Sequence, residues 1–390
     1  MDRIAARNVP SILITFMLSA FAAFSISMVV NQLSQALHTS VSGVLVSVPL
    51  DFIGGGAIGG GVVLGRQSDR LGRRPMLMLA VLIFSVSLVA AAFISNIAEL
   101  YALWFIIGIG VNSQNGISYP LLVETLRRST GLLGSVMQGL YFIGFLLDTG
   151  FYFVFHYWRT YFLASGIFAL VFSLPLAIIL VEPSRVRRFQ GGRGGQGITG
   201  KLRLYTVALS LITVGAFMLS VPLMSVVPTL FQQDGIPPYY TFVFAVLGFL
   251  GFAFAGFLAD RAQKWAVTLG FSILGIASAS LLLQVLRAHA ILAVLVPSYI
   301  SAGFFGFIGV WASQTYPQEI RAAATNIVFL VGRVLGGLAP PFLASVLSVS
   351  LKDGMGTVML LAAAVSVLGS LLYLSVMRMG DATPGTAPAR

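Results

Sequence analysis

Long apolar stretches alternate with short polar or basic segments along the whole chain. Division of the sequence at charges, Pro/Gly clusters and polar runs gives twelve apolar stretches, each near the roughly 20 residues that a membrane-spanning α-helix needs. The stretches are residues 10–31, 42–65, 75–95, 98–121, 130–154, 160–181, 204–232, 239–258, 265–286, 290–312, 323–348 and 355–377. The first has no small-residue cleavage site after it, so we expect a retained helix. The pattern predicts an all-α integral membrane protein with twelve transmembrane helices.

The composition agrees with this prediction and excludes several function classes. Apolar residues make up 57% of the 390 residues and charged residues 9%, against about 25% charged in soluble domains, which leaves no room for a large catalytic domain outside the membrane. The chain has no Cys and three scattered His, so we expect no disulfide and no metal site. It carries neither G-x-x-x-x-G-K-S/T nor H-E-x-x-H. We therefore expect no cofactor, no use of ATP and no enzymatic activity.

The basic residues are distributed unevenly between the two sides of the membrane. Alternating helices place 19 of the 23 Lys and Arg on the side of the termini, three on the opposite side, and Arg333 inside a stretch. Cytoplasmic loops carry an excess of Lys and Arg, so we expect a multi-pass protein of the plasma membrane with both termini in the cytoplasm. This bias also explains the net charge of +11, and no nucleic-acid partner is expected.

Two segments recur at matching places in the two halves of the chain. GRQSDRLGRR (65–74) follows the second stretch, and GFLADRAQK (256–264) follows the eighth, 191 residues later. A second pair, beginning at Glu124 and Glu319, follows the fourth and tenth stretches. The repeat predicts two pseudo-symmetric six-helix bundles. We expect bundles over residues 1–182 and 204–390, joined by a basic, Gly-rich cytoplasmic linker at 183–203 that is flexible or binds anionic lipid headgroups.

The first of these segments resembles the G-x-L-A-D-R-x-G-R-R signature of the major facilitator superfamily. YPQEIR (316–321), Trp158-Arg159 and EPSR (182–185) are similar to motifs of its sugar-porter and organic-acid symporter branches. The resemblance implies a monomeric secondary transporter that works by alternating access. Trp104 stands four residues before Gly108, where many members carry an Arg, so the resemblance does not supply the usual proton-coupling residues.

The resemblance also implies a conformational latch that closes the cytoplasmic side. An Asp side chain can accept hydrogen bonds from the free amides at a helix N-terminus, where the helix dipole favours negative charge. By resemblance, Asp69 faces the start of the eleventh helix and Asp260 the start of the fifth. The candidate latch residues are Gly65, Asp69, Arg70, Arg73, Arg74, Glu124, Arg127, Gly256, Asp260, Arg261, Glu319 and Arg321. Alternatively, these charges only set the topology.

Three ionisable residues fall inside the apolar stretches: Asp51, Asp148 and Arg333. Such residues are costly in a bilayer and are functional candidates. Arg333 lies about 18 Å along its helix from Arg321, and Asp51 about 21 Å from Gly65, so both lie near the midplane. Since the second and eleventh helices meet in this superfamily, we hypothesise an Asp51–Arg333 pair. The pair is either a proton-coupling switch that frees Arg333 for a carboxylate or a static brace.

The fourth and fifth stretches carry further polar candidates. Asn112, Asn115 and Tyr119 share one helical face, which either contacts substrate or bonds to a neighbouring helix. Asp148 is either a second proton-coupling site or a solvated residue at the outer rim. The candidate substrate-binding residues are Arg333, Asn112, Asn115, Tyr119, Gln138, Tyr141 and Asn326.

These features together favour proton-coupled symport of a small organic anion, a carboxylate, as the function. Sugar uptake and drug or metabolite efflux by the same fold are the alternatives. The segment from Gly139 to Gly144 lacks the Gly-Pro step of the drug-exporter signature, which weighs against efflux. The tail after Arg378 is too short for a signalling domain, which weighs against a sensor.

Overall fold

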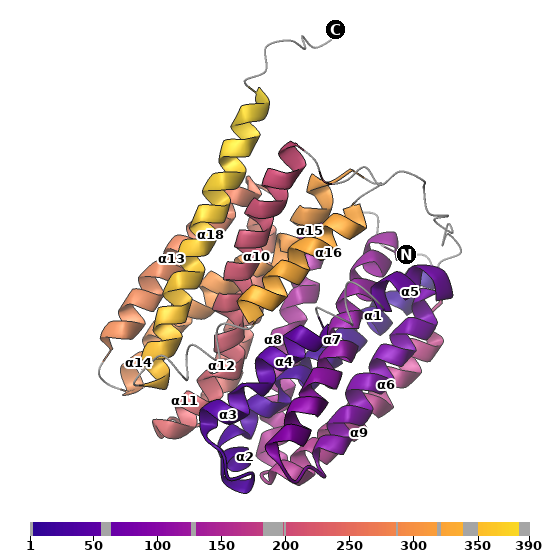
Figure 1. The fold of residues 1–390 in the computed structure, drawn as a ribbon, viewed down its shortest axis with the longest axis vertical. Helices are drawn as coiled ribbons and strands as arrows, with labels where there is room; N and C mark the ends of the chain where they lie inside the picture. Colours follow the sequence, from indigo (N-terminus) through magenta and orange to yellow (C-terminus); the bar gives the residue numbers. More distant parts are fainter. Residues whose placement is uncertain are drawn as a thin grey trace.

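A computed structural model describes residues 3–55, 64–125, 130–181, 198, 200–285, 288–317, 321–337 and 350–381. Throughout these residues the regular secondary structure is helical, with no strand. The start of α1 and the end of α18 lie at the same end of the molecule (Figure 1).

Two groups of helices, which we call the N-terminal half and the C-terminal half, stand side by side (Figure 1). The N-terminal half contains α1 Arg3–Phe24, η1 Ser25–Met28, α2 Val30–Ala36, α3 Val41–Leu45, α4 Ser47–Gly54, α5 Leu64–Leu71, α6 Arg73–Ala91, α7 Ile97–Thr125, α8 Thr130–Val154 and α9 Trp158–Ile179. The C-terminal half contains α10 Lys201–Ser225, α11 Val227–Gln233, α12 Tyr240–Ala259, α13 Lys264–Gln284, α14 Ala288–Ser301, η3 Ala302–Phe304, α15 Phe305–Thr315, α16 Arg321–Val331, η4 Gly332–Gly336 and α18 Leu351–Asp381.

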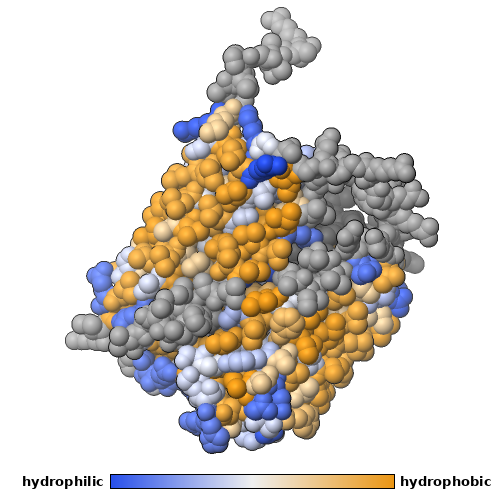
Figure 2. Space-filling model, in the orientation of Figure 1, coloured by the Kyte–Doolittle hydropathy of each residue, from blue (hydrophilic) through white to orange (hydrophobic). Residues whose placement is uncertain are grey.

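Ten helices in the described residues are long and apolar enough to cross a membrane, or eleven if one bent pair is counted. The bent pair, Val30–Ala36 with Val41–Gly54, turns by 116° and includes the start of the second predicted stretch. The eleventh stretch contributes the shorter apolar helix Ala324–Gly336. Figure 2 shows apolar side chains covering the face between hydrophilic residues at its ends. The expected all-α membrane fold is therefore confirmed.

Glycines bring α4 and α7 into backbone contact. A Cβ atom at Gly108 would lie 2.0 Å from the carbonyl oxygen of Asp51, and one at Gly54 would lie 2.2 Å from that of Phe105. Small residues permit such close approach between membrane helices. The contact fixes the height of Asp51 on α4 beside Asn112 of α7, whose side-chain Nδ2 donates to the Asp51 carbonyl at 3.4 Å.

The two halves are joined at the end of the molecule opposite the termini. Asn31 Nδ2 donates to Gln232 Oε1 at 2.8 Å, and Gln232 Nε2 donates to the Met28 carbonyl at 3.1 Å. Thr241 of α12 donates to Thr149 Oγ1 of α8 at 3.1 Å. Neutral side chains make these contacts, so they close this end without buried charge.

Candidate functional site

A cavity that opens to solvent lies between helices of both halves, and the space not filled by atoms there is about 470 Å³ including its open part. The N-terminal half contributes lining residues Phe24, Phe52, Asn112, Gln138 and Tyr141. The C-terminal half contributes Phe217, Ser220, Val221, Met224, Phe252, Phe305, Phe329 and Arg333. A molecule held in this cavity touches both halves, so its binding depends on how the halves are arranged.

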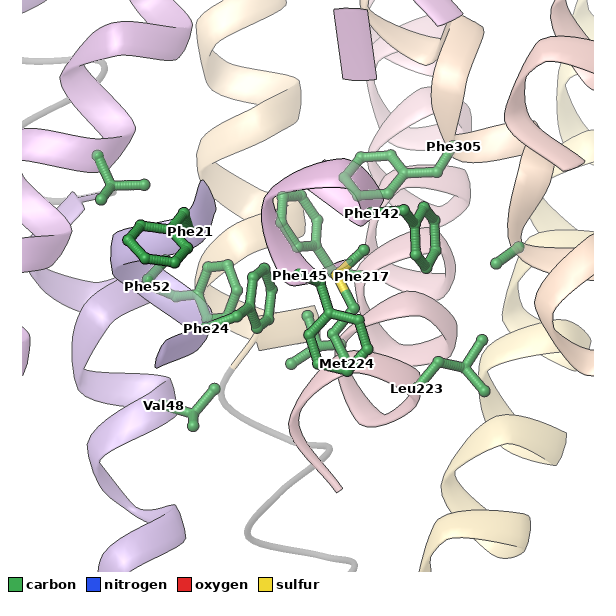
Figure 3. Close-up of a cluster of buried hydrophobic side chains, with 14 of the residues drawn as sticks. Phe21, Phe24, Val48, Phe52, Phe142, Phe145, Phe217, Leu223, Met224 and Phe305 are labelled. Carbon is green, nitrogen blue, oxygen red and sulfur yellow. The ribbon is translucent and has the colours of Figure 1, made fainter. Parts of the chain in front are cut away.

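Aromatic rings form most of the cavity wall. The Phe52 and Phe217 ring centroids lie 5.5 Å apart in an edge-on arrangement, and this pair joins the two halves. The Phe217 and Phe305 centroids lie 4.7 Å apart. Figure 3 shows Phe24 and Phe52 facing Phe217 and Met224. Aromatic edges and faces of this kind favour a planar apolar body in the cavity.

Arg333 supplies the positive charge of the described lining. Its side chain is 6% exposed, and its guanidinium carbon lies 5.7 Å from the Phe329 ring centroid. The residue lies in η4, a π-helical turn, a feature that frequently occurs at functional sites. The flanking Gly332 and Gly336 allow η4 to pack directly on α10, because a Cβ there would lie 2.3 Å and 2.5 Å from atoms of that helix.

Asp51 lies behind the cavity wall, directly before the lining residue Phe52. Its side chain is 3% exposed, and its Oδ1 atom has no hydrogen-bond partner among the described residues. Arg333 is the charged group that acts on it electrostatically. The helices are in contact here, since a Cβ at Gly337 would lie 2.6 Å from the Phe52 ring. The structure therefore brings the two candidate residues of the second and eleventh stretches into one buried site.

Of the two alternatives for Asp148, the solvated residue at the outer rim is wrong, because the side chain is buried. Its side chain is 0% exposed because α9 packs over it, and the Tyr161 hydroxyl of that helix donates to Asp148 Oδ1 at 2.7 Å. Its Oδ2 atom has no partner in the described part of the chain. Asp148 is not among the cavity-lining residues.

Four of the seven predicted substrate-binding residues line the cavity: Asn112, Gln138, Tyr141 and Arg333. Asn115 and Tyr119 lie on α7, but their side chains are outside the described part. Asn326 does not line the cavity. It lies seven residues before Arg333, about 10 Å along the helix, and Phe329 occupies the wall between them.

The sequence prediction missed most of the aromatic wall and Ser220. None of the six lining Phe residues was among the predicted substrate-binding residues. Their signal was weak because the chain has 30 Phe, and a Phe in a membrane helix usually packs against other helices or lipid. The residues of α10 that line the cavity do follow a helical spacing: Phe217, Ser220, Val221 and Met224.

At the end nearer the termini, Asp260 joins the two halves. Its Oδ2 atom accepts a hydrogen bond from the backbone amide of Leu132 at 3.0 Å, in the first turn of α8. This is the place at which the resemblance puts Asp260. A carboxylate at a helix N-terminus is stabilised by the free amides and the helix dipole.

The remaining candidate latch residues are only partly described. Arg261, in the turn after α12, stacks on Phe257 of that helix, with 3.5 Å from its guanidinium carbon to the ring centroid. Arg73 is buried at the start of α6, Arg74 is exposed beside it, and Gly256 is buried on α12. Arg127 and Glu319 lie outside the described residues, as do the side chains at positions 65, 69, 70, 124 and 321.

Comparisons with known proteins agree with this architecture. The family model of the Major Facilitator Superfamily matches residues 12–340. Among curated relatives, the niacin transporter NiaP of Acinetobacter baylyi is 24% identical, with 85% of each chain covered. A probable 4-methylmuconolactone transporter of Cupriavidus pinatubonensis is 26% identical over 92% of this chain and 89% of its own. The gallate transporter of Pseudomonas putida is 24% identical over 70% and 71%.

Solved structures share the fold at low sequence identity. A bacterial homologue of the human lysosomal transporter Spinster, in an inward-facing and unoccupied conformation, superposes with a TM-score of 0.72 at 14% identity and full coverage of both chains. A D-xylose-proton symporter superposes with a TM-score of 0.70 at 18% identity, covering 94% of this chain and 97% of its own. Because the family model matches most of the sequence, the chain belongs to the Major Facilitator Superfamily and is a membrane transporter rather than an enzyme.

Proposed function

We propose that this transporter carries a small organic carboxylate together with protons across the plasma membrane by alternating access. The observation that carries the proposal is a buried guanidinium, Arg333, in the wall of a cavity that both halves share. A guanidinium binds a carboxylate through two parallel charge-assisted hydrogen bonds. Asn112, Gln138 and Tyr141 add hydrogen-bonding groups from the opposite half. A bound anion then contacts both halves at once.

The rest of the lining favours a carboxylate attached to a planar ring. Six Phe and one Tyr surround the cavity, and such rings pack well against the faces and edges of another ring. Niacin and gallate, which appear in the names of two relatives, are both aromatic carboxylates and support this substrate class. A neutral sugar makes no use of the positive charge of Arg333, and this weighs against sugar uptake.

Asp51 is the proposed proton-coupling residue. While Asp51 is ionised, its charge competes for Arg333 with the incoming carboxylate. Protonation of Asp51 removes this competition, so that one proton and one monocarboxylate enter together. The net charge of the site then stays the same, because Arg333 exchanges one anionic partner for another. This balance holds only if Asp51 acts as a switch and not as a permanent brace.

Asp148 is a second protonated site in this proposal, which sets the pH range of turnover while Asp51 carries the one transported proton. A buried carboxylate with one unpartnered oxygen is costly when ionised, and a proton on Oδ2 relieves the cost while Tyr161 still donates to Oδ1. Asp148→Asn should therefore change the pH profile of turnover. An unchanged profile would remove Asp148 from the coupling scheme.

Topology, latch and assembly complete the proposal. We place both termini in the cytoplasm because the basic residues concentrate on their side of the membrane. The Asp260 bond to α8 then belongs to the latch that holds the cytoplasmic side shut. One chain supplies every described wall of the cavity, so a monomer suffices for transport.

The test is proton entry into proteoliposomes that contain a pH dye, with aromatic and aliphatic carboxylates, sugars and cationic drugs offered outside. Entry of protons with one carboxylate, lost in both Asp51→Asn and Arg333→Gln, is the expected result. Proton entry with a sugar, or carboxylate uptake that survives Arg333→Gln, would contradict the proposal. Proton exit from the vesicles on addition of cationic drugs alone would favour the efflux alternative, because an exporter exchanges drug for protons in opposite directions.

A further inference from the structure

We propose that Ser220 is a specificity-determining residue that selects ring carboxylates bearing a hydrogen-bonding substituent at the end of the ring away from the carboxylate. This inference rests on the proposed function, because it assumes that Arg333 binds the carboxylate. It assigns a role to a residue that lines the same cavity as Arg333 but takes no part in the proposed binding of the carboxylate or the proton.

The first observation is the face that α10 presents to the cavity. Its four lining residues follow the i, i+3, i+4, i+7 spacing of one helical face: Phe217, Ser220, Val221 and Met224. Three of them are apolar, so Ser220 is the hydrogen-bonding group that α10 offers to a molecule in the cavity.

The second observation is that the Ser220 hydroxyl is unsatisfied. Its side chain is 3% exposed, and its Oγ atom has no hydrogen-bond partner among the described residues. Other hydroxyls of α10 bond to their own helix: Thr213 donates to the Leu209 carbonyl at 2.7 Å, and Ser225 to the Val221 carbonyl at 2.8 Å. A buried hydroxyl without a partner is costly, and a ligand that supplies the missing hydrogen bond removes this cost.

The third observation is the position of Ser220 relative to Arg333. Close packing of Gly332 against Thr213 fixes the level of η4 on α10, since a Cβ at Gly332 would lie 2.3 Å from the Thr213 side chain. Ser220 lies seven residues beyond Thr213, about 10 Å along the helix at 1.5 Å per residue. A six-membered ring with a carboxylate at one end and a hydrogen-bonding group at the other bridges this separation when the Arg333 side chain extends towards it.

The geometry therefore predicts discrimination between ring acids of the same charge. A site that contains a buried group awaiting a hydrogen bond rejects analogues that leave the group unpaired. A ring hydroxyl opposite the carboxylate forms a hydrogen bond with Ser220, whereas a ring without this substituent leaves the Ser220 hydroxyl without a partner.

The test compares uptake of 4-hydroxybenzoate and benzoate into proteoliposomes by the wild type, Ser220→Ala, Ser220→Thr and Ser225→Ala. The measured quantity is the ratio of kcat/KM for the hydroxylated acid to that for benzoate. Loss of one neutral hydrogen bond should lower this ratio about 3- to 10-fold in Ser220→Ala. Ser220→Thr keeps the hydroxyl and should retain at least part of the preference. Ser225→Ala, the matched control, should leave the ratio unchanged because Ser225 bonds to its own helix.

An equal ratio in the wild type and Ser220→Ala would overturn the assignment of Ser220 while leaving the proposed function intact, provided that benzoate uptake still requires Arg333. Failure of the wild type to carry either acid would overturn both the ring-carboxylate function and the role of Ser220.

Discussion

Replacement of Asp51 by Asn should separate substrate binding from proton coupling. Asn occupies nearly the same volume as Asp at this 3% exposed position but takes up no proton and does not compete for the Arg333 guanidinium. We expect the variant to bind the carboxylate and to exchange labelled for unlabelled substrate. We also expect it to lose accumulation driven by a pH gradient.

The size of the effect follows from the linkage of one proton to one carboxylate. In the wild type, carboxylate binding requires Asp51 to be protonated. Above the pH at which this carboxyl titrates, binding must therefore be accompanied by the uptake of one proton. Each further pH unit therefore weakens binding up to tenfold, equivalent to about 1.4 kcal/mol. Below that pH the affinity is constant, because the proton is already bound. Asp51→Asn should show the low-pH affinity of the wild type at every pH.

The assay is equilibrium binding of a labelled ring carboxylate to purified protein between pH 5 and 9. Asp234→Asn is the matched control, since it makes the same chemical change at an exposed residue and should keep the wild-type slope. A slope that persists in Asp51→Asn would refute the role of Asp51 as the proton site. Loss of all binding in a folded Asp51→Asn variant would indicate a structural brace instead.

Three further perturbations test separate parts of the structure. Arg333→Gln should weaken carboxylate binding roughly 10- to 100-fold, since a hydrogen bond to a charged group contributes about 1.5–3 kcal/mol. Competition binding measures the affinity, and an unchanged affinity would exclude contact between the carboxylate and Arg333. Asp260→Asn should loosen the cytoplasmic end. A Cys introduced at Ser135 of this Cys-free chain should then be alkylated faster in Asp260→Asn than in the parent. Equal rates would show that the hydrogen bond between Leu132 and Asp260 is not a latch. Gly108→Ala should lower the free energy of unfolding of the detergent-solubilised protein by about 1–3 kcal/mol, because α4 leaves no room for the methyl group. Gly270→Ala should have no such effect, because nothing lies within 4 Å of the added carbon, and equal effects would contradict the packing argument.

The helical membrane fold and the charged part of the site could be predicted from the sequence. Apolar stretches of about 20 residues have few interpretations other than membrane helices, and an Arg inside such a stretch is rare enough to mark a functional candidate. Asn112 and Gln138 are identifiable for the same reason, because amides are costly in a bilayer. The helix breaks were harder to predict: the π-helical turn at Gly332–Gly336 depends on close packing against α10, which no local pattern shows.

The parts that sequence reasoning missed depend on contacts between distant segments. The burial of Asp148 depends on Tyr161, which lies on another helix, 13 residues further along the chain. Ser220 resembles every other helix Ser in the sequence, and only its cavity position and missing hydrogen bond distinguish it. Asn326 was expected at the site, but it is not among the cavity-lining residues, and Phe329 of the same helix forms the wall there instead.

The most direct test of the central claim compares two driving forces for carboxylate uptake into proteoliposomes. Valinomycin and potassium set the membrane potential, and buffers set the pH difference independently. Because one proton neutralises one monocarboxylate in the proposed site, an inwardly directed proton gradient should drive accumulation at zero potential, and a potential alone should not. Accumulation driven by the potential alone, or uptake indifferent to the proton gradient, would contradict the exchange of partners between Asp51 and Arg333.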